Sequence, residues 1–236
     1  MIKQERSYQV PGRTRLARWF LRPIFRGLFH LLSDVHVSGK ENIPEHGPYL
    51  IAINHVSLFE PPLVLSFWPV PAEAVGAIDI WDRPGQSVLV RLYGGIPVHR
   101  GEYDRQLLDT MIAVLRSSRP LLIAPEGGRT HTPGLRRGLP GVAYVMDKTR
   151  VPVLPVGISG ATDEFLRQAL RLLRPRLEMQ IGSPVVLPPI EGKGETRREG
   201  LQRNSDLIMK HIASLLPVDY RGIYGEPILS SSKTSL

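Results

Sequence analysis

A histidine and a glutamate five residues apart, His55 and Glu60, are the side chains of this sequence best placed for acid–base chemistry. His55 follows the apolar run 49–53, which is typical of a buried strand, and Pro61 and Pro62 fit the first turn of a helix. A histidine fixed where a strand ends can take the proton from a hydroxyl group as that group attacks. An acid in the first turn of the following helix can hold the imidazole tautomer and stabilise the imidazolium that forms.

The same segment also has a purely structural interpretation. Ser57-Leu58-Phe59-Glu60 matches a capping box, in which the serine caps the helix and the glutamate reaches back to a backbone N–H. Glu60 could then be a cap and nothing more. The segment alone leaves both interpretations open.

Three more segments follow the first in a fixed order: 94–100 (GGIPVHR), 124–130 (APEGGRT) and 151–157 (VPVLPVG). With the first segment they resemble the sequence blocks of the lysophospholipid acyltransferase family, which includes the 1-acylglycerol-3-phosphate acyltransferases. The resemblance covers most of the chain, and residues 219–224 resemble the closing segment of some bacterial members. The chain departs from the commonest family pattern at Glu60, where Asp is usual.

The resemblance implies that His55 is the base, that Glu60 is its partner and that Pro155 shapes the wall of the acyl-donor site. An exposed guanidinium can grip a phosphate bidentately, and glycines free backbone amides to face an anion. Taken singly, Arg100 would be a surface arginine, and the Glu-Gly-Gly-Arg run would be a tight turn. The residues that we expect to bind the phosphate of the acceptor are Arg100, Glu126, Gly127, Gly128, Arg129 and Thr130.

The reaction that the resemblance implies is transfer of a fatty acyl group from acyl-CoA or acyl carrier protein to the free hydroxyl of a lysophospholipid. The foremost acceptor is 1-acyl-glycerol-3-phosphate, which would give phosphatidic acid, and another lysolipid or hydroxyl acceptor is the alternative. No cofactor or metal is implied, since the acyl thioester is a co-substrate.

Two other classes of function compete with this one. A catalytically inactive peripheral membrane protein is compatible with Glu60 in place of the usual Asp. A metal-dependent hydrolase would use His55, Glu60 and either His99 or Glu126. The seven histidines are scattered and form no His-x-x-x-His pair, which disfavours a metal site.

Composition limits the partners. The 236 residues carry a formal net charge of +8 and the pI is about 10.0, so an anionic partner is expected. No nucleic-acid-binding module is recognisable. The chain has no cysteine, which excludes thiolate catalysis, and no apolar run reaches the roughly 18 residues of a membrane-spanning helix.

Residues 1–33 hold most of the charge imbalance, with seven Lys and Arg residues against one Glu. On a helical wheel Arg15, Arg18, Arg22 and Arg26 form one stripe opposite an apolar arc. This pattern predicts a helix in a membrane interface with arginines on anionic headgroups. The alternative is an ordinary amphipathic helix packed on the domain with solvated arginines. We therefore expect a peripheral or monotopic membrane protein at the cytoplasmic face.

Short apolar runs alternate with longer helical patterns, which predicts an α/β fold with a largely parallel sheet flanked by helices. We expect an arm at 1–33, an acyltransferase domain at 34–224 and a polar, disordered tail at 225–236. Pro152 and Pro155 cannot donate to a ladder and predict a strand edge or end. The predicted strands are 35–37, 49–53, 74–78, 97–99, 121–124, 153–156 and 177–181; the predicted helices are 58–67, 85–93, 103–116, 139–148, 161–173 and 196–215.

Overall fold

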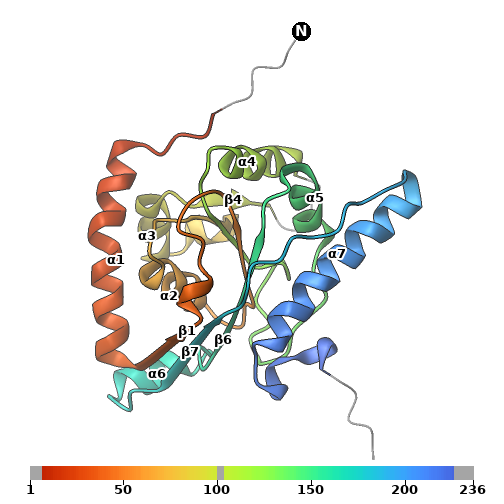
Figure 1. The fold of residues 1–236 in the computed structure, drawn as a ribbon. Coiled ribbons are helices and arrows are strands. Elements are labelled where there is room, and N and C mark those ends of the chain that lie inside the picture. Colours follow the sequence, from red (N-terminus) through yellow and green to blue (C-terminus); the bar gives the residue numbers. More distant parts are fainter. Residues whose placement is uncertain (1–6, 100–103, 226–236) are drawn as a thin grey trace, which may run out of the picture.

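The computed structural model describes residues 7–99 and 104–225, and Figure 1 shows their fold. The part of the expected tail from residue 226 on lies outside the described residues. All seven predicted strands are confirmed, as β1 (Asp34–Ser38), β2 (Leu50–Ile53), β3 (Glu73–Ala77), β4 (Ile96–Val98), β5 (Leu121–Ile123), β6 (Val153–Ser159) and β7 (Arg176–Ile181).

The expected helices are also present. After α1 (Gly12–Leu32) come α2 (Glu60–Phe67), α3 (Gln86–Tyr93), α4 (Arg105–Arg116), α5 (Pro140–Thr149), α6 (Phe165–Leu170) and α7 (Gly194–Ser214). Helix α6 is much shorter than the predicted 161–173. Leu172 and Arg174 adopt positive φ angles of 59° and 45°, which a helix does not accommodate.

The strands form one sheet in the order β1-β7-β6-β2-β5-β3-β4. Every neighbouring pair is parallel except β6 and β7, which confirms the largely parallel α/β fold. Successive residues of a strand face opposite sides of the sheet. Ile51 and Ile53 pack with α1, α2 and α6, whereas Leu50 and Ala52 pack with α4, α5 and α7.

Pro152 directly precedes β6 and so marks a strand end, as expected, whereas Pro155 lies within β6, inside the sheet between β7 and β2. Pro155 is tolerated there because the regular pairing with β7 begins only at the next residue, Val156. The carbonyl of Pro155 accepts a hydrogen bond from Gly182 N at 2.9 Å, just beyond β7. The proline nitrogen therefore faces a break in the β6–β7 ladder.

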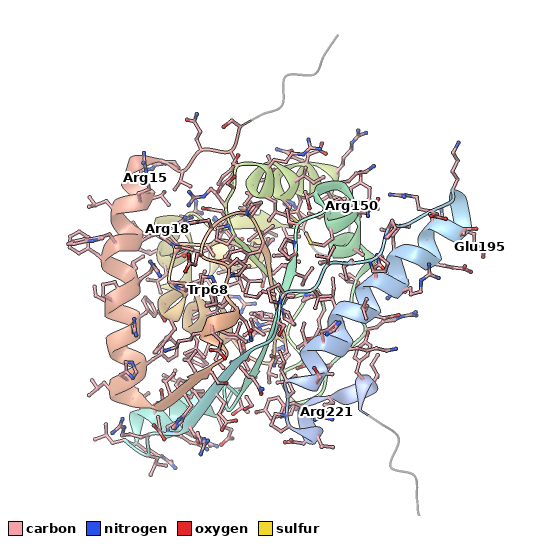
Figure 2. All side chains as sticks on the ribbon, viewed as in Figure 1. Arg15, Arg18, Trp68, Arg150, Glu195 and Arg221 are labelled. Atoms are coloured by element: carbon pink, nitrogen blue, oxygen red, sulfur yellow. The ribbon has the colours of Figure 1, made fainter. Side chains whose placement is uncertain are left out.

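Helix α1 packs against α2 and α3, and two arginines of its stripe, Arg18 and Arg22, turn inward, whereas Arg15 and Arg26 are exposed. Arg18 is only 1% exposed, and its guanidinium donates to both oxygens of Glu73 at 2.7 and 2.6 Å (Figure 2). Arg22 donates to the backbone oxygens of Leu65, at 3.0 Å, and of Trp68. The prediction that these two arginines meet headgroups was wrong, since acceptors inside the domain satisfy them. Helical periodicity identified the arginine stripe but could not show which of its arginines face the domain.

The apolar arc of α1 is consequently split. Phe25, Phe29 and Leu32 pack against the core, while six other large apolar side chains of the helix face outward, Trp19 with 69% of its surface exposed. This outward set is called the α1 apolar face below. Its residues are Leu16, Trp19, Phe20, Ile24, Leu28 and Leu31.

None of the described helices is both long enough and apolar enough to cross a bilayer. The helix runs through Pro23 without a break.

Candidate active site

The predicted base and its partner meet at the edge of the sheet where the parallel strands end. β2 ends at Ile53, and Asn54 then fastens the chain to β6, because its side chain accepts from Ile158 N and donates to Ile158 O, both at 2.8 Å. His55 is the next residue. Ligands of open parallel sheets bind outside the carboxyl ends of the strands, so His55 stands where substrate is expected.

Nδ1 of His55 lies 3.2 Å from Oε2 of Glu60. A carboxylate only accepts hydrogen bonds, so Nδ1 carries the proton and Nε2 is left as an acceptor. The Glu60 side chain is 1% exposed and that of His55 is 14% exposed. The pair therefore combines a shielded acid with an imidazole that solvent, and hence substrate, can reach.

Glu60 also performs the capping role that the sequence left as an alternative. Oε1 accepts the backbone N–H of Ser57 at 2.8 Å and that of Val56 at 3.1 Å, and Ser57 Oγ accepts from Phe59 N at 3.1 Å. α2 begins at Glu60, as the catalytic geometry required. One carboxylate thus reaches back to the turn before the helix, as in a capping box, and also faces the imidazole, whereas the Ser57 hydroxyl accepts from Phe59 N and caps no N–H of the helix itself.

The segment 124–130 and the residues that follow it hold the backbone at His55 in place through hydrogen bonds. Thr130 N donates to His55 O at 2.9 Å, and His131 N donates to Val56 O at 3.0 Å. Glu126 is buried, and its carboxylate accepts from the backbone N–H of His55 at 3.0 Å and of Arg136 at 2.9 Å. Burial raises the pKa of the Glu126 carboxyl, although these two N–H groups oppose the shift. The Glu126 carboxylate is therefore held next to the backbone of His55, and both of its oxygens accept backbone N–H groups.

In the turn around Gly127, the side chain of Arg129 is the cationic group without a partner among the described residues. Gly127 has a φ of 70°, which favours glycine, and a Cβ there would lie 2.3 Å from Leu139 Cδ1, so a larger residue would also displace that leucine. The guanidinium of Arg136 donates to the carbonyls of Gly128 and Arg129 at 2.7 and 3.1 Å and braces the turn. The half-buried Arg129 side chain itself makes no hydrogen bond or ion pair within residues 7–99 and 104–225.

Two predicted site residues are not among those that the structure brings together here. Arg100 lies outside the described residues. Pro155 is buried within β6 opposite Ala52, where its ring neighbours Gly182. Its role at an acyl-donor site stays a prediction.

Comparison with known proteins identifies the family to which a chain with these features belongs. A family model described as Acyltransferase matches residues 34–159, which contain His55, Glu60 and the turn around Gly127. The chain belongs to the acyltransferase family. The resemblance carried by the four blocks is thereby confirmed at the level of the family.

Relatives of this acyltransferase chain agree with that assignment. A 1-acyl-sn-glycerol-3-phosphate acyltransferase of Borreliella burgdorferi is 24% identical over 136 residues, which are 57% of this chain and 54% of that protein. The chain thus spans about half the length of this relative. The crystal structure of the 1-acyl-sn-glycerophosphate (LPA) acyltransferase PlsC from Thermotoga maritima matches with a TM-score of 0.60. That match has 24% identity and covers 87% of this chain and 82% of that one, so it shows a shared fold.

The structure adds two residues to the acyltransferase site that sequence reasoning did not assign. Asn54 joins β2 to β6 directly before the base. Tyr220, from the closing segment, accepts a hydrogen bond from Gly160 N at 3.0 Å, just after β6 ends. Adjacency to His55 was a usable signal for Asn54, whereas nothing local pointed to the contact of Tyr220.

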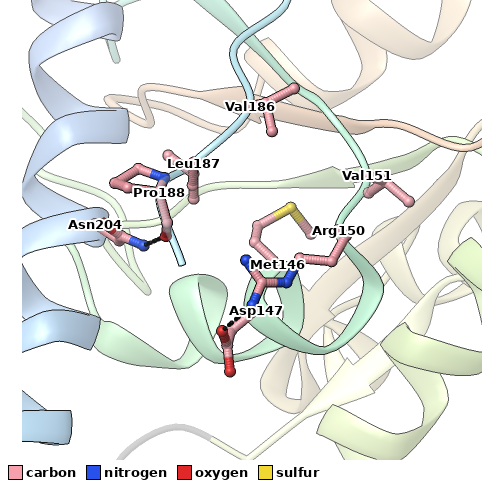
Figure 3. A pocket seen from close by; sticks show the side chains of 8 residues that line it. All are labelled: Met146, Asp147, Arg150, Val151, Val186, Leu187, Pro188 and Asn204. Carbon is pink, nitrogen blue, oxygen red and sulfur yellow. Dashed lines mark hydrogen bonds and ion pairs between the residues drawn. The ribbon is translucent and has the colours of Figure 1, made fainter. Parts of the chain in front are cut away.

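Figure 3 shows a hollow of this acyltransferase that lies away from the base. It is bordered by Met146 and Arg150 of α5 and its end, by Pro188 and by Asn204 of α7. Arg150 precedes β6, so the hollow lies at the amino edge of the sheet, opposite the edge that carries His55. Within the part of the chain that the structure describes, no three His, Asp or Glu side chains group as metal ligands would.

Proposed function

We propose that this chain transfers a fatty acyl group from acyl-CoA or acyl carrier protein to the free hydroxyl of a lysophospholipid, foremost 1-acyl-glycerol-3-phosphate. The observation that carries the proposal is the contact of His55 Nδ1 with Glu60 at 3.2 Å, at the carboxyl edge of the sheet. The two relatives are named as acyltransferases of this acceptor, which supports its choice.

The geometry suits a direct transfer. Nε2 of His55 takes the proton of the acceptor hydroxyl, and the oxygen attacks the carbonyl carbon of the thioester. The C–S bond breaks, the new C–O ester bond remains, and the imidazolium returns its proton to the leaving thiolate. Glu60 stabilises the imidazolium and keeps Nδ1 as the donor.

A cationic site beside the base is expected to hold the acceptor's phosphate. Arg129 supplies a guanidinium that the described residues leave unpaired, and Thr130 connects its turn to the backbone of His55. A guanidinium can bind phosphate through two parallel hydrogen bonds. Arg100, Gly127 and Gly128 are proposed to complete this site.

We further propose that the protein works at the cytoplasmic face of a membrane containing anionic lipids, with the α1 apolar face against the acyl chains. Exposed contiguous apolar surfaces of this kind mark interaction sites. Trp19 adds an amphipathic ring of the type enriched at the headgroup level.

The test is acyl transfer from labelled acyl-CoA and from acyl carrier protein to a panel of lysolipids in mixed micelles. We expect labelled phosphatidic acid from 1-acyl-glycerol-3-phosphate and no product with His55→Ala. Product from another lysolipid alone would change the acceptor and keep the reaction. No product from any pair of donor and acceptor would refute the proposal and favour an inactive membrane-binding protein.

A further inference from the structure

Residues 165–176, called the α6 turn below, form a leucine-rich and basic surface that the catalytic chemistry does not use. They contain four arginines and no acidic residue. Four leucines of the turn project into solvent, with exposed fractions from 45% to 74%. They are Leu166, Leu170, Leu172 and Leu173.

The backbone holds these leucines outward. Leu172 has a φ of 59°, which is uncommon for a residue other than glycine, and Arg174 has a φ of 45°. Hydrogen bonds from Leu172 N to Ala169 O, at 2.9 Å, and from Leu173 N to Gln168 O, at 3.2 Å, close the turn. Unfavourable backbone angles that expose large apolar side chains suggest a functional surface.

The α6 turn lies against the carboxyl end of α1. The guanidinium of Arg174 donates to His30 O at 3.1 Å and to Ser33 O at 3.4 Å, and the ring centroids of Phe29 and Phe165 are 6.3 Å apart. The exposed leucines therefore lie close to the carboxyl end of the helix that carries the α1 apolar face.

The charges of the turn fit an anionic surface. Arg167 pairs with Glu164, Arg176 pairs with Glu178 at 2.6 Å, and Arg174 binds the carbonyls of α1. Arg171 is exposed and makes no hydrogen bond or ion pair with its side chain in the described ranges. A free guanidinium among exposed leucines matches a boundary between anionic headgroups and acyl chains.

We propose that the α6 turn is a second lipid contact, which inserts its leucines into an anionic bilayer and places Arg171 on the headgroups. A single helix lying on a membrane leaves the domain free to roll about the helix axis, and a second contact beside it fixes the roll. Phe165 also lies 4.9 Å, between ring centroids, from Phe59, which immediately precedes Glu60. The lipid contact is independent of catalysis, but its use, orienting the site towards the lysolipid, rests on the proposed function.

The proposal is tested by flotation of the full chain with vesicles of phosphatidylcholine containing a minor share of phosphatidylglycerol. Leu170→Ser/Leu173→Ser should bind about tenfold more weakly, because burying leucines drives partitioning. Arg171→Gln should bind about fivefold more weakly and lose part of its dependence on phosphatidylglycerol. A matched control, Val186→Ser/Val218→Ser, removes two side chains that are equally exposed but belong to other elements, and should bind as wild type does.

Wild-type binding by Leu170→Ser/Leu173→Ser would overturn the proposal. If Leu170→Ser/Leu173→Ser differed from wild type in molecular mass in the absence of lipid and bound vesicles as wild type does, the turn would instead bind a second copy of the chain. Transfer to a short-chain, monomeric acceptor separates this result from the proposed function. The variants should retain that transfer, whereas its absence in wild type would refute the activity and leave the flotation result valid.

Discussion

Oε2 of Glu60 lies 3.2 Å from Nδ1 of His55, while Oε1 of the same carboxylate accepts the backbone N–H groups of Val56 and Ser57. The carboxylate that faces the imidazole is thus held by the turn that joins the two residues. Because both oxygens of Glu60 have partners here, the length of the side chain at position 60 matters.

We expect Glu60→Asp to lower kcat about tenfold, although Asp is the usual family residue, because the carboxylate retracts by about 1.5 Å, one C–C bond. KM should change little, since Glu60 acts through His55. Ser57→Ala is the comparison: it removes the acceptor of Phe59 N and the 3.3 Å hydrogen bond from Ser57 Oγ to Glu60 Oε1, and should cost about 1 kcal/mol of stability. Its kcat should fall less than that of Glu60→Asp, because Oε2 still lies opposite His55 Nδ1. An Asp variant as active as wild type would show that the backbone adapts.

Glu126→Gln should lower kcat and the melting temperature together. The amide can accept from only one of the two backbone N–H groups, of His55 and Arg136, that the carboxylate now accepts, and its NH₂ opposes the other. Loss of activity without loss of stability would instead indicate direct contact of Glu126 with substrate.

The same variant has a predictable dependence on pH. Burial raises the pKa of Glu126 in the folded state, so the folded protein gains protons as pH falls towards the ordinary glutamate range. The free energy of unfolding of wild type should therefore rise relative to Glu126→Gln as pH falls through the raised pKa. Denaturant titrations of both proteins at several pH values measure this difference, and a difference that is independent of pH would contradict the shift.

The ion pair of Arg18 and Glu73 should dominate the attachment of α1. Glu73→Gln leaves the guanidinium buried without its charge partner, and such changes cost about 3–5 kcal/mol. Burial alone would raise the pKa of Glu73, but hydrogen bonds from Arg18, Tyr8 and Arg119 outweigh it and lower the pKa. The stabilisation is therefore present above about pH 4.3, the pKa of an unfolded glutamate, and is lost as pH falls through the folded pKa.

Acid unfolding of wild type and Glu73→Gln checks this prediction, and the variant should lose less stability below pH 4. Arg105→Gln serves as a control, because Arg105 and Asp109 form an exposed pair at 4.0 Å and such pairs contribute little. Equal acid sensitivity in wild type and Glu73→Gln would assign the loss to other carboxylates.

Local patterns in the sequence located the strands and the pair of His55 and Glu60 but not the long-range contacts. The run 49–53 is buried on both faces, so it was recognisable as a strand, and Ser57 with Glu60 predicted a helix start within two residues of the observed one. The partner of Arg18, Glu73, is 55 residues away in the sequence. Helical periodicity therefore predicted the stripe but not that Arg18 faces the domain. Glu126 binds backbone N–H groups, which no side-chain pattern encodes.

Removal of Trp19 and Phe20 from the α1 apolar face, as Trp19→Ser/Phe20→Ser, should weaken vesicle binding by about tenfold or more. Both side chains are more than half exposed, so the melting temperature should change little. Vesicle flotation and thermal unfolding of the same preparations measure the two effects. Unchanged flotation would remove α1 from the membrane contact.

The central claim, that His55 and Glu60 act as one unit in acyl transfer, is tested most directly by kcat/KM of wild type, His55→Ala, Glu60→Gln and the double variant. Without the imidazole the carboxylate has nothing to orient, so the double variant should be as slow as His55→Ala alone. Losses that multiply in the double variant, or a His55→Ala protein as active as wild type, would contradict the account.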